Sequence, residues 1–134
     1  MRYLLDVSAL VAAGVQKHEF FEQVVAWFQE LSPEEDEFAT CAITEIGFVR
    51  VLGLPQYGLP IEESKAVLQQ LKASSRIAFS FIADDQDASR LPRWVKMPKQ
   101  VADGHLAQLA KANGAVLATL DRGIPGAFVI PEES

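Results

Sequence analysis

The sequence predicts an α/β protein, a three-layer α/β/α sandwich around a parallel β-sheet of four to five strands. Two observations predict this fold. Short apolar runs alternate along the chain with segments of helical periodicity, and turn residues separate the two kinds of segment. Strands that are covered by helices on both faces are apolar throughout. With 134 residues, of which 49% are hydrophobic, the chain is expected to form a single domain over residues 1–134.

Five segments have the pattern of strands. The first, residues 2–6, is a short apolar run that ends in an acid, as expected for a buried strand. The other four strands are predicted at residues 38–41, 77–82, 115–119 and 127–130. Because helical segments separate most of these runs, we expect parallel strands joined by right-handed crossovers, with helices on both faces of the sheet.

Periodicity and capping residues predict helices at residues 8–13, 19–31, 44–52, 61–74 and 101–113. Ser8 is a plausible N-cap for the first helix, which Gly14 would end, and Gly114 would close the last helix in the left-handed conformation. Thr44 would cap or open the third helix. Residues 83–99 are polar and contain proline. The second helix has a wide apolar face, because its large side chains recur at three- and four-residue steps: Phe20, Val24, Trp27, Phe28 and Leu31.

Composition restricts the classes of protein to which the chain can belong. Its net charge is −6, from 12 basic and 18 acidic residues, which is unusual for a nucleic-acid-binding protein. No apolar run approaches the roughly 18 residues of a membrane span, no signal peptide is recognisable, and the single cysteine, Cys41, cannot form an internal disulfide. These features predict a soluble protein of the cytoplasm that does not bind membranes.

Four acidic side chains are expected to meet at one edge of the sheet. Ligands of an open parallel sheet bind beyond the carboxyl ends of the strands, where the strand order reverses. A single Asp at a strand end is more often a cap or turn residue, but four acids in this context favour a site. Asp6 ends the first strand, Asp121 lies just past the fourth, Asp103 falls in the first turn of the last helix, and Glu45 begins the helix after the second strand.

Carboxylates that converge repel one another unless a cation neutralises them. Oxygen ligands suit Mg²⁺ or Mn²⁺, whereas zinc would favour a Cys/His pattern that the sequence does not have. A metal ion held by few carboxylates keeps several waters, and one of them can attack a phosphate. The sequence therefore predicts a site for Mg²⁺ or Mn²⁺, with Asp6, Glu45, Asp103 and Asp121 as its acids.

Three segments of the sequence carry a resemblance to a known family: LLDVSAL at residues 4–10, TEIGFVRVL at residues 44–52 and VADGHLAQLAKANGAVLATLDRGI at residues 101–124. Taken in this order, they resemble a PIN domain and, more narrowly, the VapC-type toxins of bacterial toxin–antitoxin pairs. The middle motif is the most characteristic of this subgroup. The last segment is fairly specific, because it combines Asp103, the helix end at Gly114 and the T-x-D of Thr119 and Asp121.

The resemblance implies an α/β/α fold, endoribonuclease activity with Mg²⁺ or Mn²⁺, a homodimer, and neutralisation by a cognate antitoxin whose tail enters the active-site groove. The small polar residue that the family has after its first acid matches Ser8, and its hydroxyl before the last acid matches Thr119. Both are implied to hold carboxylates by hydrogen bonds. Ser8 stands where Asn is frequent and Gly104 where Ala is common. The four acids of the family match Asp6, Glu45, Asp103 and Asp121.

Two arginines near the acids are candidate contacts to the RNA substrate. Arg50 lies five residues past Glu45 and would bind a phosphate or pair with an active-site acid, with a surface salt bridge as the alternative. Arg122 follows Asp121 and would contact substrate or an antitoxin carboxylate, with a solvated turn as the alternative.

A basic stretch near the last helix offers further contacts. Arg93 and Lys96 flank Trp94, and together they would form a rim that binds RNA, since aromatic rings stack on single-stranded bases. The alternative is a solvated loop with Trp94 packed on the protein. His105 lies two residues from Asp103 on a helix and faces elsewhere, so it is not predicted as a ligand or base.

Two other functions are compatible with parts of this pattern. One is an interaction protein with the same fold but little activity, which binds RNA or a protein partner. The other is a phosphoryl-transfer enzyme of the haloacid-dehalogenase type. That enzyme would need a second Asp two residues after Asp6, where Ser8 stands. Cleavage of RNA by the purified protein with Mn²⁺ separates these hypotheses from the nuclease.

Overall fold

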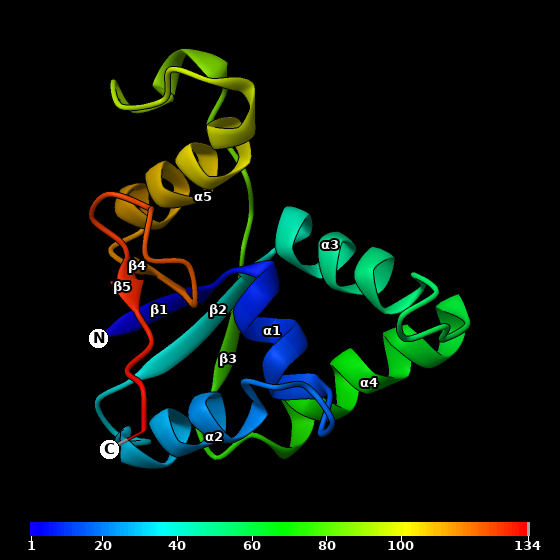
Figure 1. Ribbon diagram of the computed structural model, residues 1–134. Helices are drawn as coiled ribbons and strands as arrows, with labels where there is room; N and C mark the ends of the chain where they lie inside the picture. The colour runs from blue at the N-terminus through cyan, green and yellow to red at the C-terminus, as the bar shows by residue number, and fades with distance from the viewer. Residues whose placement is uncertain (134) are drawn as a thin grey trace.

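The computed structural model describes residues 1–133 as a parallel five-stranded sheet between two layers of helices, so the predicted architecture is confirmed (Figure 1). The strands are β1 (Arg2–Leu5), β2 (Glu37–Cys41), β3 (Phe79–Ile82), β4 (Val116–Thr119) and β5 (Phe128–Val129). The α-helices of the described chain are α1 (Val7–Gly14), α2 (Phe21–Glu30), α3 (Ala42–Leu52), α4 (Ile61–Ser74) and α5 (Val101–Ala112).

The strand order, β3-β2-β1-β4-β5, creates a reversal beside the first strand. The chain adds β2 and β3 on one side of β1 and then returns to place β4 and β5 on its other side. Ligands of open α/β sheets bind at such a reversal, beyond the carboxyl ends of the strands. The register pairs Leu5 of β1 with Ala118 of β4. The residues that follow these two strands therefore lie side by side.

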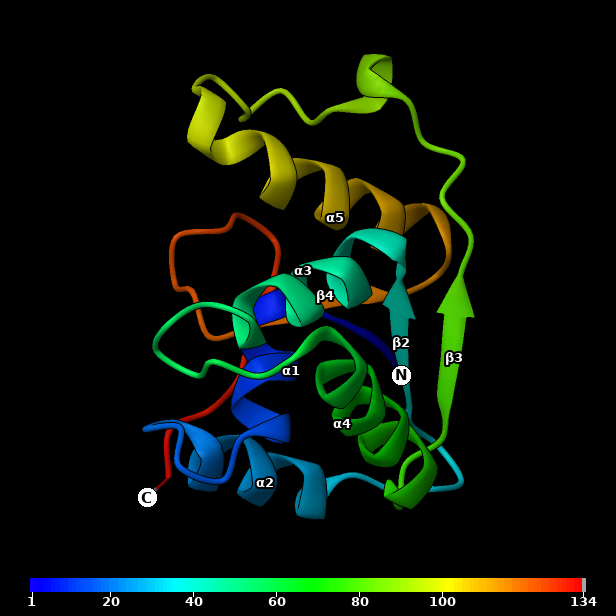
Figure 2. The ribbon, with the colours of Figure 1, turned by 90° about the vertical axis from the view of Figure 1, so that its right-hand side faces the viewer.

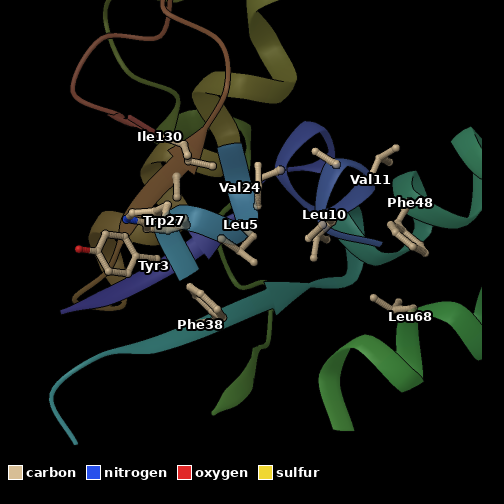
Figure 3. Close-up of a cluster of buried hydrophobic side chains, with 14 of the residues drawn as sticks. Tyr3, Leu5, Leu10, Val11, Val24, Trp27, Phe38, Phe48, Leu68 and Ile130 are labelled. Carbon is tan, nitrogen blue, oxygen red and sulfur yellow. The ribbon is translucent and has the colours of Figure 1, made fainter. Parts of the chain in front are cut away.

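The two faces of the sheet are covered by different helices. Alternate side chains of a strand point to opposite faces. In β1, Tyr3 and Leu5 join a buried cluster with α1, α2, α3 and α4, whereas Leu4 packs with α5. Figures 1 and 2 show α5 alone on its side of the sheet. Figure 3 shows the larger cluster, in which Trp27 of α2 meets Tyr3 edge-on with ring centroids 4.9 Å apart.

The predicted elements are all present, and their ends differ from the prediction by at most two residues. One detail at α1 is wrong. Asp6, rather than Ser8, is the N-cap of α1, because its carboxylate accepts a hydrogen bond from the N–H of Ala9. Gly14 ends the helix as predicted, and the extended backbone of Val15 follows it.

Other local expectations have mixed outcomes. Gly114 has a φ of 66°, which confirms its left-handed conformation after α5. Thr44 lies inside α3, and Cys41 is the N-cap: the hydroxyl of Thr44 accepts a hydrogen bond from the N–H of Cys41 at 3.0 Å. The 83–99 stretch forms short 3₁₀ turns. Among residues 1–133, no helix combines the length and the apolar character that crossing a bilayer requires.

A cation from the segment before β3 holds the end of α2. The last four carbonyl groups of a helix have no partner within the helix, and the helix dipole makes this end negative. Arg76 supplies the missing donor and a positive charge. Its Nη2 lies 2.9, 3.0 and 2.8 Å from the carbonyl oxygens of Phe28, Gln29 and Leu31. Arg76 therefore ties α2 to the approach to β3.

Candidate active site

Asp6 follows β1 and is only 6% exposed. Its Oδ1 accepts hydrogen bonds from the N–H of Ala9 at 2.9 Å and from the hydroxyl of Ser8 at 2.7 Å. Burial raises the pKa of the Asp6 carboxyl, while hydrogen bonds from Thr119, Ala9 and Ser8 oppose part of this rise. The two hydroxyls that the sequence associates with the acids, Ser8 and Thr119, thus both contact Asp6. A carboxylate buried in this way is stabilised by a nearby cation.

Asp121 follows β4 and lies beside Asp6 across the switch point. Its backbone N–H donates to Oγ1 of Thr119 at 2.9 Å, and its Oδ1 accepts a hydrogen bond from the N–H of Gly123 at 2.8 Å. These bonds fix the turn after β4 and leave Asp121 exposed. The negative charge of Asp121 contributes to the raised pKa of Asp6, so the two carboxyl groups interact electrostatically.

Asp103 lies in the first turn of α5. Desolvation raises the pKa of Asp103, and the charges of Asp121 and Asp6 raise it further. Three aspartates from three segments therefore face a common region at the carboxyl edge of the sheet. Within residues 1–133, their side chains do not stand as a ready-made group of three metal ligands.

Glu45, in the first turn of α3, is engaged by two other side chains. Its Oε2 accepts a hydrogen bond from the hydroxyl of Thr40 at 2.5 Å and forms an ion pair with Nζ of Lys72 at 2.7 Å. Lys72 comes from α4, and both charged groups are partly exposed. The three aspartates thus influence one another electrostatically, whereas Glu45 has an ion-pair partner of its own. The pattern of α4 does not reveal this partner, because it depends on how α4 packs on α3.

Comparison with known proteins decides the family. The sequence model of the PIN-domain family matches residues 3–127, a span that includes all four acids. The chain belongs to the PIN-domain family. It is 36% identical over 132 residues to ribonuclease VapC44 of Mycobacterium tuberculosis, and the match covers 92% of this chain and 89% of that protein. This PIN domain is therefore a member of the VapC group, as the sequence motifs predict.

Two solved structures resemble this PIN domain over almost its whole length. VapC20 of Mycobacterium tuberculosis, a toxin that cleaves the sarcin–ricin loop, has a TM-score of 0.68 at 11% identity, covering 98% of this chain and 99% of that one. VapBC2 from Rickettsia felis, bound to a DNA fragment from their promoter, has a TM-score of 0.61 at 16% identity, covering 96% and 97%. At these identities, the likeness concerns the fold.

The two predicted arginine contacts of the PIN domain differ in their surroundings. Arg50 is exposed and lines a groove between α3 and α4, together with Glu45 and Lys72. Arg122 is exposed next to Asp121 and forms an ion pair with Glu132, so part of its charge is already neutralised. Arg50 therefore lines the same groove as one of the four acids, Glu45.

The other two predicted cations lie in the segment before α5. Arg93 lines an open cleft beside that helix, together with Trp94. Lys96 is exposed, and its backbone N–H donates to Oε1 of Gln100 at 2.8 Å. The indole of Trp94 packs against the α5 side of the core, as the alternative interpretation expects, but it also contributes to the wall of the cleft.

A histidine–aspartate pair near the same edge of the sheet was not predicted. Nε2 of His105 in α5 lies 2.5 Å from Oδ2 of Asp84, which follows β3. Partial desolvation raises the pKa of Asp84, but hydrogen bonds from Gln86 and His105, and the charge of His105, lower it below its ordinary value. The pair ties the segment after β3 to α5. Its sequence signal is an acid two residues after a predicted strand.

Gly104 departs from the family pattern for a steric reason. A Cβ at this position would lie 2.2 Å from Cγ2 of Val95, and it would also touch Pro92 and Trp94. Real Cβ atoms essentially never approach another atom so closely. Glycine therefore allows the 92–95 segment to pack directly on the first turns of α5, one residue from Asp103.

Proposed function

We propose that this chain is an endoribonuclease toxin that hydrolyses RNA phosphodiester bonds with Mg²⁺ or Mn²⁺. The observation that supports the proposal is the electrostatic interaction of three aspartates near the switch point of the sheet, where burial and mutual repulsion raise the pKa of Asp6 and of Asp103. The relative VapC44 is named a ribonuclease, which supports RNA as the substrate.

The donor set fits a hard divalent cation. Carboxylate oxygens are the ligands that Mg²⁺ and Mn²⁺ prefer, and a cation among the three aspartates would remove their repulsion. Asp6, Asp103 and Asp121 would hold the ion, and Glu45 would join them directly or through water. When bound, the ion supplies stabilisation of negative charge at the scissile phosphate and a more acidic water.

Side chains around the acids would orient the reacting groups. The hydroxyl of Ser8 and the N–H of Ala9 donate hydrogen bonds to the carboxylate of Asp6, and Thr119 would add to them, so the direction of this carboxylate would not depend on the cation. Glu45 would accept a hydrogen bond from the attacking water and so point it at phosphorus. The bonds of Thr40 and Lys72 to Glu45 fix the position of its carboxylate.

Basic side chains would bind the phosphates on either side of the scissile bond. Arg50 in the groove beside Glu45 and Arg122 beside the aspartates are the candidates nearest the acids. Arg93 and Lys96 would contact the RNA further along the strand. Each ionic contact to a phosphate releases a counterion, so RNA binding should weaken as salt rises.

The test is cleavage of RNA by the purified protein with Mn²⁺. The expected result is cleavage that EDTA abolishes and that Asp103→Asn lowers by about 100-fold or more. The control, Glu30→Gln, neutralises an exposed acid at the far end of α2 and should cleave like the wild type. Cleavage that survives EDTA, or that is unchanged in Asp6→Asn, would refute the proposal. No cleavage of any RNA together with no metal binding would favour the interaction protein.

We further propose a cognate antitoxin and a homodimer as partners in the cytoplasm. Ile46 of α3 and Ile61 of α4 are 69% and 57% exposed and line the groove that also contains Arg50. Large apolar side chains that line one groove are typical of interaction surfaces. Light scattering with and without the antitoxin tests both partners. A monomer that does not bind the product of the neighbouring gene would refute them.

A further inference from the structure

A cleft on the outer side of α5 has the lining of a site for single-stranded RNA. It has a volume of about 560 Å³ and lies between residues 92–94, α5, the start of β4 and residues 125–126. Figure 2 shows α5 between the segment that follows β3 and the loop that leads to β5. The lining includes Arg93, Trp94 and Lys111 but no acidic residue. The chain as a whole has a net charge of −6, which repels a polyanion. This cleft is an exception, because its lining contains two cations and no acid.

Both cations of the cleft are available to a ligand. Arg93 and Lys111 are exposed, and neither forms an ion pair within the described residues. Lys72 and Arg122, in contrast, are already paired with acids of the protein. A phosphate in the cleft would therefore gain two charge-assisted contacts without displacing an internal partner.

Trp94 gives the cleft a surface on which a base can stack. Cη2 of its indole lies 3.7 Å from the place that a Cβ on Gly104 would occupy, so the ring is braced against α5. The same residue is only partly buried and lines the cleft. The other tryptophan, Trp27, is 4% exposed in the core. An aromatic ring beside free cations is the combination that proteins use to bind unpaired nucleotides.

The cleft shares two segments of the chain with the acidic site. One wall is α5, which carries Asp103 in its first turn and Lys111 about 12 Å further along its axis. The opposite wall is the segment that follows Asp121 and reaches residues 125–126. An RNA strand held at the aspartates would reach the cleft by following α5 from Asp103 toward Lys111.

We propose that this cleft binds the single-stranded part of the RNA substrate next to the cleavage site, with one base stacked on Trp94 and neighbouring phosphates held by Arg93 and Lys111. The base must be unpaired, because a paired base does not expose its face to an aromatic side chain. The proposal rests on the proposed ribonuclease function and adds a substrate subsite to it.

The experiment measures binding of a short, single-stranded 2′-O-methyl oligonucleotide in EDTA, where no cleavage occurs. Tryptophan fluorescence should be quenched, and Trp94→Ala should weaken binding by about tenfold, with a smaller effect for Trp94→Phe. Arg93→Gln and Lys111→Gln should each lower the slope of log affinity against log salt by about 0.7. The control is Lys17→Gln, an equal loss of charge on the exposed turn after α1, which should leave the slope unchanged.

The outcomes separate the cleft from the catalytic proposal. If the wild type cleaves RNA but the Trp94, Arg93 and Lys111 variants bind the oligonucleotide like Lys17→Gln, the cleft is refuted and the nuclease stands. If Lys111→Gln weakens binding in a protein that shows no metal-dependent cleavage, the cleft stands and the nuclease is refuted. Because Lys111 is exposed, this variant decides the question even if Trp94→Ala fails to fold. The proposal is also overturned if an acidic peptide displaces the oligonucleotide from the wild type while the cleft variants bind RNA as the wild type does.

Discussion

Replacing Gly104 by alanine is expected to destabilise the protein, although alanine is the better residue in a helix. Helix propensity favours the substitution by about 1 kcal/mol. The added Cβ, however, would lie 2.2 Å from Cγ2 of Val95. Val95 is β-branched and cannot easily rotate away, and overpacking of this kind costs about 1–3 kcal/mol. The expected net result is a loss of about 1 kcal/mol in the free energy of unfolding.

The assay is urea unfolding of four proteins: the wild type, Gly104→Ala, Val95→Ala and the double variant. Val95→Ala removes the obstructing methyl group, and the remaining neighbours of the new Cβ, at 3.4 and 3.7 Å, are near ordinary contact distance. In that background, Gly104→Ala should stabilise the protein by about 1 kcal/mol, so the coupling between the two sites is about 2 kcal/mol. If Gly104→Ala stabilises both backgrounds equally, residues 92–95 do not pack on α5 as described. In that case the contact that holds the Trp94 ring against α5 is absent as well.

Three further predictions follow from contacts elsewhere. Arg76→Met should lower the free energy of unfolding by about 1 kcal/mol, because the carbonyls that end α2 lose their donor; an unchanged urea midpoint would contradict this. In the metal-free protein, Asp103→Asn should raise stability at neutral pH, because the native state raises the pKa of this carboxyl and so disfavours its ionised form. The gain should disappear as the pH falls below about 3.9, where the wild-type carboxyl is neutral in both states, and thermal unfolding in EDTA across pH measures it. Lys72→Met should lower kcat by about tenfold through misplacement of Glu45, and Lys72→Arg should restore part of it; an unchanged kcat in Lys72→Met would show that Glu45 does not depend on this ion pair.

The sequence was sufficient to predict the sheet and two of its acids because those features follow from local patterns. An apolar run covered on both faces is visible in the residues themselves, as in β1 and β4. Parallel strands share a carboxyl edge, so residues that follow neighbouring strands must be close. Asp6 and Asp121 could therefore be placed together once β1 and β4 were recognised as neighbours.

Features that depend on contacts between elements were not predicted. Two polar residues near the start of α1 could each cap it, and only the backbone geometry shows that Asp6 does so. The ion pair of Glu45 with Lys72 depends on how α3 and α4 cross. The reason for Gly104 lies in a loop nine residues earlier, at Val95, which no periodicity within α5 can reveal.

The most direct test of the proposed site is a calorimetric titration of Mn²⁺ into the metal-free protein. The wild type should bind the ion, Asp103→Asn and Asp121→Asn should each lose at least about tenfold in affinity, and Glu30→Gln should bind like the wild type. Binding should also release protons near the raised pKa of Asp6 and of Asp103, because the ion displaces them. Equal affinity in the aspartate variants and the wild type, or no binding by the wild type, would contradict a metal site at these aspartates.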